Sequence, residues 1–378
     1  MTPAVLREVA AQWGRIGYTG FGGPPAHIAL LRDLCVDRRR WLTAHEFEDA
    51  VAACNLLPGP ASTQLAIFCA WRVAGPIGAV VGGAAFILPG LAAILALAVV
   101  FLGSPPDWIR GAGAGAGAAV AAVAVRAGLG LVPDSWRRSP ARWRWVAYAV
   151  LGGAAAATLG PWLVLVLVGC GAIEVTWQIA ARGDRASVHA WPIAAAAATG
   201  TGGVLALVWV AFKVGALAYG GGFVIIPLMQ ADAVDTYHWM TNTEFLSAVA
   251  LGQVTPGPVT QTVAVVGYAA YGIAGGLMAA LVAFAPSFSF VLLGAKRFDA
   301  LRHNDAMRAF LAGAGPAAIG AIIGAAIPLA FALDEVWQYA VLAGAAISLF
   351  VFRRGVVVTL LLAGVVGLIA EMVGAPLP

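Results

Sequence analysis

Continuous apolar runs of roughly 20 residues recur along most of this chain, and they leave it very few architectures. Of its 378 residues, 61% are hydrophobic and 11% are charged, whereas a soluble globular chain carries about 25% charged residues. Backbone N–H and C=O groups in lipid need partners within the protein, so only helices and closed barrels span a bilayer. Because the runs are continuous rather than alternating, a β-barrel is disfavoured. We therefore predict an all-α polytopic membrane protein.

The charged and sulfur-bearing residues exclude several other classes. The formal net charge of +4 comes mostly from arginines between the apolar runs, where arginine sets topology, so we expect no nucleic-acid partner. The stretch GAGAGAGAA (111–119) contains a nominal dinucleotide-binding pattern, but it lies in an apolar run and follows no strand. Four cysteines show neither CxxC nor metal-ligand spacing: Cys35, Cys54, Cys69 and Cys170. We expect no metal and no cofactor.

One unit occurs twice in the chain. A shift of 198 residues places WLTAHEFEDAVAACNLLPGP (41–60) on WMTNTEFLSAVALGQVTPGP (239–258), with ten of twenty positions identical. The same shift pairs RIGYTGFGGP (15–24) with KVGALAYGGG (213–222). Internal repeats of this size are typical of secondary transporters. We predict a first transmembrane repeat over 1–190 and a second over 191–378.

Equivalent loops of the two repeats carry opposite charge. RDLCVDRRRW (32–41) is rich in arginine, while its counterpart ADAVDTYHW (231–239) has no Lys or Arg. Three further pairs invert in the same way: GSPPDWIR (103–110) with KRFDALRHNDAMR (296–308), DSWRRSPARWRW (134–145) with LDEVW (333–337), and AAAATLG (154–160) with FRRG (352–355). Since Lys and Arg favour cytoplasmic loops, the repeats are predicted to have inverted topology, related by a pseudo-two-fold axis in the membrane plane.

Each repeat shows about six hydrophobic segments, in the first repeat near 4–31, 46–70, 76–103, 108–132, 145–159 and 161–179. Inverted topology requires an odd number of net crossings per repeat, so one segment must turn back. The segment that carries Pro58, Gly59 and Pro60 is the best candidate for a broken or re-entrant helix. We expect about five membrane crossings plus this helix in each repeat.

Proline and glycine interrupt the apolar runs at equivalent places. PGP occurs at 58–60 and 256–258, and TGFGGP (19–24) matches YGGG (219–222). Interrupted helices free backbone groups that need a polar partner at membrane depth, and half-helix N-termini suit an anion. For one motif alone a plain kink is an equal alternative. Two motifs in register favour a substrate site, with the following binding residues: Gly22, Gly23, Gly59, Ser62, Thr63, Gln64, Gly220, Gly221, Gly222, Gly257, Thr260 and Gln261.

Two cations are equivalent under the repeat. Arg15 and Lys213 each precede a glycine-rich break by about one helical turn. A cation within a membrane helix indicates function by default, so we predict that both bind the same anion at the midplane. The alternative is that the side chains reach out to an interface, which applies more to Arg15, near the N-terminus.

Two glutamates are also equivalent under the repeat. Glu46 and Glu244 follow Thr43 and Thr241 by three residues, which is the spacing of a capping box. Capping is the favoured role, and proton coupling is the alternative. His27 has no histidine at its repeat mate, Ile225, so a coupling role and a structural hydrogen-bonding role stay equally open.

The paired motifs resemble a known family. GFGGPPAH with NLLPGPASTQ in the first repeat, and YGGGFVIIPLMQ with TPGPVTQT in the second, are similar to the chromate ion transporter (CHR) family in its long, two-domain form. The resemblance covers the whole chain and implies chromate efflux across a bacterial inner membrane, with sulfate as a related tetrahedral dianion. The second break, YGGG, lacks the proline of FGGP, so the two half-sites are expected to differ in geometry.

Together these features predict a secondary transporter, not an enzyme. It would export a divalent tetrahedral oxyanion, chromate first, as a multi-pass protein of the inner (plasma) membrane. A sulfate or other oxyanion transporter, or an anion channel of the same fold, is the alternative, and a membrane-embedded enzyme or a non-transporting scaffold subunit is more remote. As partners we expect the oxyanion and the lipid bilayer, with a homodimer as an open option.

Overall fold

Every regular element in the described part of the chain is helical. The computed structural model describes residues 3–55, 57, 59–139, 141–159, 162–182, 202–218, 222–295 and 304–378. The predicted boundary between the repeats, 190/191, and the predicted binding residues Gly220 and Gly221 lie outside these residues. Within them, five helical stretches are long and apolar enough to cross a membrane: Ala61–Leu102, Asp107–Arg138, Leu163–Ala180, Val259–Gly294 and Asp305–Phe331. The all-α membrane fold is confirmed.

The two halves have matching elements. The first contains α1 (Pro3–Thr19), α2 (Pro24–Arg32) with the π-helix η1 (Asp33–Arg38), α3 (Ala44–Cys54), α4 (Ala61–Leu102), α5 (Asp107–Ala118), α6 (Val120–Arg138), α7 (Arg142–Thr158) and α8 (Leu163–Arg182). The second contains α9 (Val204–Leu217), α10 (Ile225–Gln230) with the π-helix η4 (Ala231–Thr236), α11 (Asn242–Val254), η5 (Val259–Gln261), α12 (Thr262–Gly294), α14 (Asp305–Gly324), α15 (Ala326–Phe331), α16 (Val336–Ala346) with η7 (Ile347–Val351), and α17 (Val356–Met372). Even the π-helices η1 and η4 are 198 residues apart.

Each of the first two segments of the chain forms a helical hairpin, in which the start and the end of the segment lie close together. Glu8, near the start of α1, forms an ion pair of 2.5 Å with Arg39, which follows η1, and the Trp13 and Trp41 rings stack 6.0 Å apart. The chain therefore enters along α1, breaks at 20–23 and returns along α2. Likewise Glu46, in the first turn of α3, pairs with Arg72, so the chain returns again after the PGP break.

This arrangement confirms one sequence prediction and corrects another. The PGP-bearing segment turns back, as expected. The segment over 4–31 turns back as well, whereas the sequence analysis treated it as a crossing. Hydropathy reports only that a segment is apolar, and the reversal is made by the Gly-rich break at 20–23, where Gly22 and Gly23 have φ of 99° and 72°. In the second half, a Lys213–Asp232 contact of 2.6 Å likewise places α9 beside η4.

The longest helix, α4, is also folded back on itself. As a straight rod, its 42 residues would measure about 63 Å, twice the hydrocarbon thickness. The backbone angles at Ala74 and Gly75 leave the helical region. A Cβ added to Gly82 would lie 2.4 Å from the Cβ of Ala70. In a straight helix these two residues would be about 18 Å apart. Helix α12 turns in the same way at Tyr271 and Gly272. Residues 76–102 and 273–294 are thus the long membrane-crossing parts.

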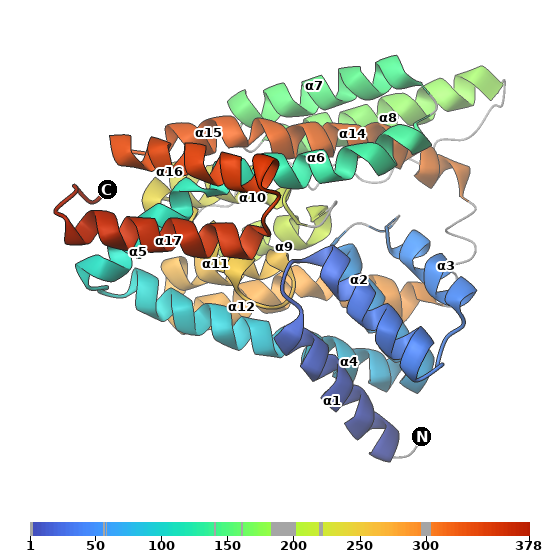
Figure 1. The fold of residues 1–378 in the computed structure, drawn as a ribbon. Helices are drawn as coiled ribbons and strands as arrows, with labels where there is room; N and C mark the ends of the chain where they lie inside the picture. The colour runs from blue at the N-terminus through green and yellow to red at the C-terminus, as the bar shows by residue number, and fades with distance from the viewer. Residues whose placement is uncertain are drawn as a thin grey trace.

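These two long parts run antiparallel beside each other, as inverted repeats require. A Cβ added to Gly83 would touch the Phe288 ring at 2.5 Å, and one added to Gly276 would touch Leu95 at 2.5 Å. Because the later residue of one helix lies beside the earlier residue of the other, the two helices run in opposite directions. The N-terminus and C-terminus lie at opposite ends of the molecule (Figure 1). The two long parts are therefore inverted relative to each other, as the loop charges predicted, whereas the expected odd number of crossings per half is not retained once the first two segments both turn back.

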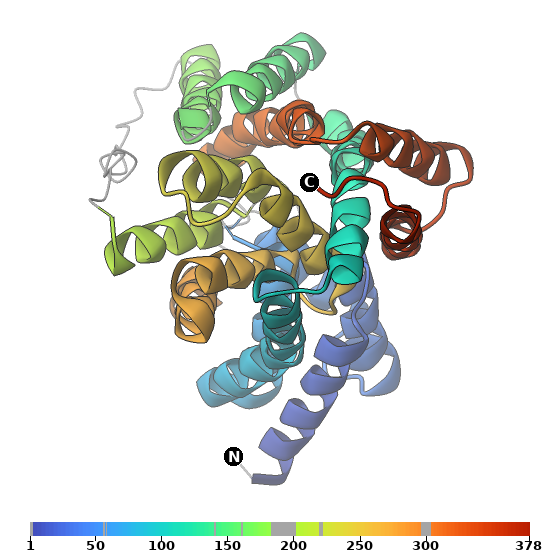
Figure 2. The ribbon, with the colours of Figure 1, turned by 90° about the vertical axis from the view of Figure 1, so that its left-hand side faces the viewer.

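Helix packing divides the molecule differently from the sequence. Helices α1–α4 pack with α9–α12 to form what we call the inner bundle, and α5–α8 pack with α14–α17 to form the outer bundle. Within the outer bundle, partners come from opposite halves: α14 packs on α7 and α8, and α17 packs on α5. Figure 2 shows this exchange, with green α7 and α8 beside the orange-red α14. Helix α11 makes the main contact between the two bundles.

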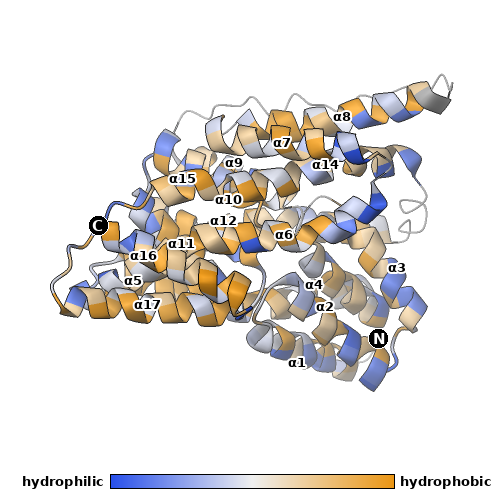
Figure 3. Ribbon diagram, turned by 45° about the horizontal axis from the view of Figure 1, so that its top comes forward, coloured by the Kyte–Doolittle hydropathy of each residue, from blue (hydrophilic) through white to orange (hydrophobic). Residues whose placement is uncertain are grey.

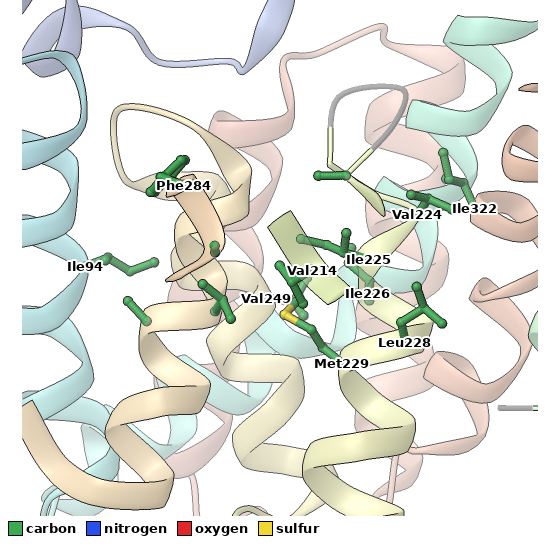
Figure 4. Packing of buried hydrophobic residues seen from close by; sticks show 14 of the residues in the cluster. Ile94, Val214, Val224, Ile225, Ile226, Leu228, Met229, Val249, Phe284 and Ile322 are labelled. Carbon is green, nitrogen blue, oxygen red and sulfur yellow. The ribbon is translucent and has the colours of Figure 1, made fainter. Parts of the chain in front are cut away.

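Apolar side chains fill the interior and also cover the outside of the helices. Figure 4 shows buried residues of the inner bundle, with Val214, Ile225, Ile226 and Met229 close together beside Val249. Many large apolar residues are exposed as well, among them Leu281 at 74% and Leu293 at 83%. Figure 3 shows hydrophobic colour along the helices and hydrophilic colour gathered around α3 and the N-terminal end. An apolar exterior of this kind is what lipid contact demands.

Close packing at equivalent glycines gives a test of the repeat geometry. Gly17→Ala and Gly215→Ala should each lower the thermal unfolding temperature of the detergent-solubilised protein, because the new Cβ would lie 2.4 Å from the Phe86 carbonyl oxygen and 2.0 Å from that of Ala283. Overpacking of this kind costs about 1–3 kcal/mol. Gly14→Ala is the matched control, since its Cβ would meet Ala85 at an ordinary 3.8 Å. Equal unfolding temperatures for all three variants would contradict the packing.

Arginine placement predicts which side faces the cytoplasm. Single cysteines introduced at Asp107 or Asp235 should react in intact cells with a membrane-impermeant thiol reagent, and one at Arg137 should react only after the membrane is opened. The arginine-rich loops lie on the side of Arg137, and Lys and Arg favour the cytoplasm. The four native cysteines are buried, which keeps their background reaction low. The opposite labelling pattern would reverse the topology.

Candidate functional site

The helix breaks of the two halves meet inside the inner bundle. The backbone N–H of Gly257, in the second PGP, donates to the carbonyl oxygen of Gly20 at 3.0 Å. A Cβ on Gly59, in the first PGP, would lie 3.2 Å from the Gly215 carbonyl oxygen at the end of α9. Each PGP therefore touches the glycine-rich region of the opposite half. Gly59 and Gly257 have φ of 113° and 96°, which glycine adopts without strain.

Each PGP also packs against the long helix of the opposite half. Gln261 follows the second PGP and donates from Nε2 to the Ile87 carbonyl oxygen on α4 at 2.8 Å. Gly90, one turn further along α4, makes this approach feasible, because a Cβ there would lie 2.1 Å from the Pro256 carbonyl oxygen. Gly90 follows the turn at Gly75 by as many residues as Ser287 follows the turn at Gly272, so Ser287 is the equivalent position on α12. Its Oγ lies 3.3 Å from the position that a Cβ on Gly59 would take.

The polar residues after each PGP are fully enclosed. Side chains predicted to bind substrate are at most 2% exposed: Ser62, Thr63, Gln64, Thr260 and Gln261. Gln253, Thr255, Thr262 and Ser287, which the sequence analysis did not select, are buried with them. We call these nine residues and His27 the polar centre. Gln253 lies within the stretch 239–258 in which the repeat was found, and Ser287 could have been located only from the fold of α12.

Several polar atoms of the polar centre have no hydrogen-bond partner. Among the described residues other than Gln64, the buried side-chain atoms that lack one are Thr63 Oγ1, Thr260 Oγ1, Gln261 Oε1, Gln253 Nε2 and Ser287 Oγ. Each such atom costs about 1–3 kcal/mol when it is left dry. Folded proteins leave only a few per hundred residues, so their concentration here marks a place where water or a polar ligand would find hydrogen-bond partners.

His27 links the two breaks of the first half. Its Nε2 lies 2.9 Å from the Gly20 carbonyl oxygen and its Nδ1 lies 3.2 Å from Ser62 Oγ. A carbonyl can only accept, so in the neutral ring Nε2 carries the proton and Nδ1 accepts from the Ser62 hydroxyl. The ring edge also contacts Phe86 at 5.0 Å. These contacts are those of a structural, hydrogen-bonded histidine, which is one of the two roles that the sequence left open. A role of His27 in coupling stays a prediction.

The two predicted cations do not meet at the polar centre. Arg15 is exposed, on the face of α1 that points away from the buried Trp13 and Ile16. Lys213 is mostly buried but is already paired, because its Nζ lies 2.6 and 2.9 Å from the carboxylate oxygens of Asp232. No Lys or Arg is fully buried in the described part of the chain. The expected pair of converging cations is therefore absent from this arrangement, and their binding role stays a prediction.

Glu46 and Glu244 cap helices. In both halves the glutamate accepts from the backbone N–H of the preceding threonine, at 2.9 Å from Thr43 and 2.7 Å from Thr241, and its own N–H donates to the threonine hydroxyl at 3.2 Å. The Thr43 backbone N–H and hydroxyl hold the pKa of Glu46 below its ordinary value, and Arg72 adds to this. Both residues lie at helix starts, a helix length from the breaks.

The predicted glycine donors are only partly available. Gly22, Gly23, Gly59 and Gly222 all have positive φ, as tight turns at a ligand would require. The N–H of Gly257, in contrast, is already used by Gly20. The polar centre therefore offers hydroxyl and amide groups together with glycine backbone, and its described side chains carry no net charge while His27 is neutral.

A cavity of about 620 Å³ lies between the two bundles at the end of α7. It is bordered by α10, η4, the start of α11 and α15, and its polar lining is Thr158, Gln230, Asp235 and Asn242. Gln230 donates to Asn242 at 3.1 Å across this wall. The cavity therefore brings solvent to the outer surface of η4, on the side of the molecule opposite to the arginine-rich loops.

Comparison with known proteins agrees with the repeat and the motifs. A family model described as chromate transporter matches residues 7–175 and 205–368, which fall in the two halves. A chromate transport protein of Cupriavidus metallidurans is 32% identical over 337 residues, covering 86% of this chain and 82% of that protein. One from Pseudomonas aeruginosa is 30% identical over 348 residues, covering 87% and 82%, and a probable one from Synechococcus elongatus is 27% identical over 338 residues, covering 86% and 84%.

No solved structure matches the chain significantly. The relatives above are named as transporters, and the match extends over both breaks of each half. On this basis, and with the duplicated breaks meeting at one polar centre, the chain belongs to the chromate transporter family.

Proposed function

We propose that this protein is a secondary transporter that exports chromate across the bacterial inner membrane, with the dianion held at the polar centre. The observation that carries the proposal is the set of buried, unpartnered hydroxyl and amide atoms where the breaks of both halves meet. Relatives named chromate transport proteins support the substrate.

A neutral donor set suits an oxyanion that must later be released. Hydrogen bonds to a charged acceptor are roughly twice as strong as neutral ones, so several hydroxyl, amide and glycine N–H groups can replace part of the hydration shell of the anion. Thr63 and Thr260 follow equivalent PGP motifs and can each turn a hydroxyl proton toward the anion. Without a buried, unpaired cation, the anion is not trapped by a charge that it would have to leave behind.

Bundle packing suggests how the site changes access. Since the outer bundle interlocks helices from both halves, the sequence halves cannot rock as separate bodies. The moving units that we propose are the inner and outer bundles, with α11 at their contact. This replaces the simpler expectation that one repeat rocks against the other, while keeping alternating access around a fixed centre.

The membrane potential would drive export. The potential changes the free energy of moving one elementary charge across the membrane by about 2.3 kcal/mol per 100 mV. With the inside negative, the potential favours expelling a dianion.

Flux of radiolabelled chromate in proteoliposomes tests the proposal. We expect saturable flux that responds to an imposed potential and that sulfate inhibits. Sulfate flux without chromate flux would make the protein a transporter for another oxyanion. Single-channel currents in a planar bilayer would make it an anion channel, and chemical conversion of the anion without net flux would make it an enzyme.

Removing the unpartnered hydroxyls should separate binding from stability. Thr63→Val and Thr260→Val keep the side-chain shape, so we expect chromate affinity to fall at least tenfold while the unfolding temperature stays the same or rises, because a buried unsatisfied group is lost. Thr359→Val is the matched control, since its hydroxyl is also buried but contacts Ser348 Oγ at 2.9 Å on the outer bundle. That variant should lose stability and keep its affinity. Unchanged affinity in both central variants would contradict the site.

A further inference from the structure

Lys213 and Asp232 form an isolated ion pair inside the inner bundle. Their side chains are 13% and 6% exposed, and Lys213 Nζ contacts both carboxylate oxygens, at 2.6 and 2.9 Å. Lys213 also lies 5.8 Å from the centroid of the Trp209 ring, one turn earlier on α9. Removing two charges from water costs several kcal/mol per ion, and the attraction between them only offsets this. A buried pair in a membrane helix therefore indicates function more than stability.

The pair belongs to one half only. The repeat mates of Lys213 and Asp232 are Arg15, which is exposed, and Leu34, which is buried and apolar. A pair needed for the hairpin fold itself would be expected in both halves, because the α1–η1 and α9–η4 hairpins are equivalent. The first hairpin is instead closed by Glu8 and Arg39, near its open end.

The position of the pair connects the polar centre with solvent. Lys213 lies four residues before the end of α9. Gly215 lies between Lys213 and that end, and its carbonyl oxygen borders Gly59. Asp232 lies on the π-helix η4, whose other surface borders the cavity through Ala231 and Asp235. π-Helical turns often mark functional sites. The pair thus stands between the proposed anion site and water on the side opposite to the arginine-rich loops.

Few other titratable groups face Asp232. Lys213 is the only one on α9, and Tyr237, just after η4, interacts with Asp232 electrostatically. Asp235 is the other acid on η4. On α11 the only titratable side chain is Glu244, which is held by Thr241, and α14 and α15 have none after Arg308. Asp232 is therefore the one carboxylate in this region whose charge is balanced by a single neighbouring cation.

We propose that Asp232 is the proton-coupling residue of this transporter and that Lys213 is shared between Asp232 and the oxyanion. When Asp232 takes up a proton on a carboxylate oxygen, its charge is lost and Lys213 becomes available to the anion at the polar centre. When the anion leaves, Lys213 returns to Asp232, which releases the proton. This inference rests on the proposed function. It keeps the substrate-binding role predicted for Lys213 and adds Asp232 as its partner when the anion is absent.

Equilibrium binding of radiolabelled chromate and sulfate to the full-length purified protein, measured between pH 6 and 9, tests the proposal. For the wild type we expect affinity to rise as pH falls, by up to tenfold per pH unit for one linked proton. Sulfate is the more informative ligand, because it does not itself change protonation over this range. Asp232→Asn imitates the protonated acid, so its affinity should be high and independent of pH.

Three further variants separate coupling from a merely structural role. Asp232→Glu should restore the pH dependence. Lys213→Met should bind weakly at every pH. Asp107→Asn removes an exposed acid from the same side of the molecule, outside the polar centre, and should keep the wild-type pH dependence.

Proteoliposomes that contain a pH-sensitive dye give a second readout. Wild-type flux should be accompanied by proton movement in the same direction as the anion, and Asp232→Asn should carry the anion without it. An Asp232→Asn protein that folds and keeps the wild-type pH dependence, or that still moves protons, would overturn the inference and leave the proposed function standing. A wild-type protein that binds and carries no oxyanion at any pH would overturn both.

Discussion

A polar backbone inside an apolar medium is the constraint on which this structure depends. Each proline or glycine break frees N–H and C=O groups that lipid cannot satisfy. The structure places the breaks of both halves against one another, so that Gly257 donates to Gly20 and Gln261 donates to Ile87. Breaks that would be costly if they lay apart become partners of each other, and some atoms, such as Thr63 Oγ1 and Thr260 Oγ1, are left buried without a partner. Under the proposed function, folding and substrate binding draw on the same groups.

Sequence periodicity and loop charge were sufficient to predict an all-α membrane protein with matching halves. Apolar runs indicated the membrane helices, and the shift of 198 residues indicated the repeat, including two PGP motifs that each contact the opposite half. The buried state of Ser62 and Gln261 could also be anticipated, because polar residues after a break in an apolar chain have few other places to lie.

Other features depend on geometry that a single sequence does not carry. Hydropathy could not distinguish a crossing over 4–31 from a hairpin, because both are apolar, and it could not show that α4 turns at Gly75. The exposed position of Arg15 follows from the rotation of α1 about its axis. A comparison of the two halves gives no signal at Asp232, because its repeat mate is Leu34. Asymmetric residues are the ones that such a comparison cannot find.

The reciprocal contact between each PGP and the long helix of the opposite half has an evolutionary consequence. The first PGP borders Ser287 and the second borders Gly90, so each unit supplies the wall for the other unit's turn. A single unit folded alone would present an unfinished turn to lipid. An ancestor encoding only one unit would therefore have had to insert in both orientations and assemble as an antiparallel, two-fold symmetric dimer. Fusion of two genes would then have fixed the orientations and freed the two walls to diverge into glycine and serine.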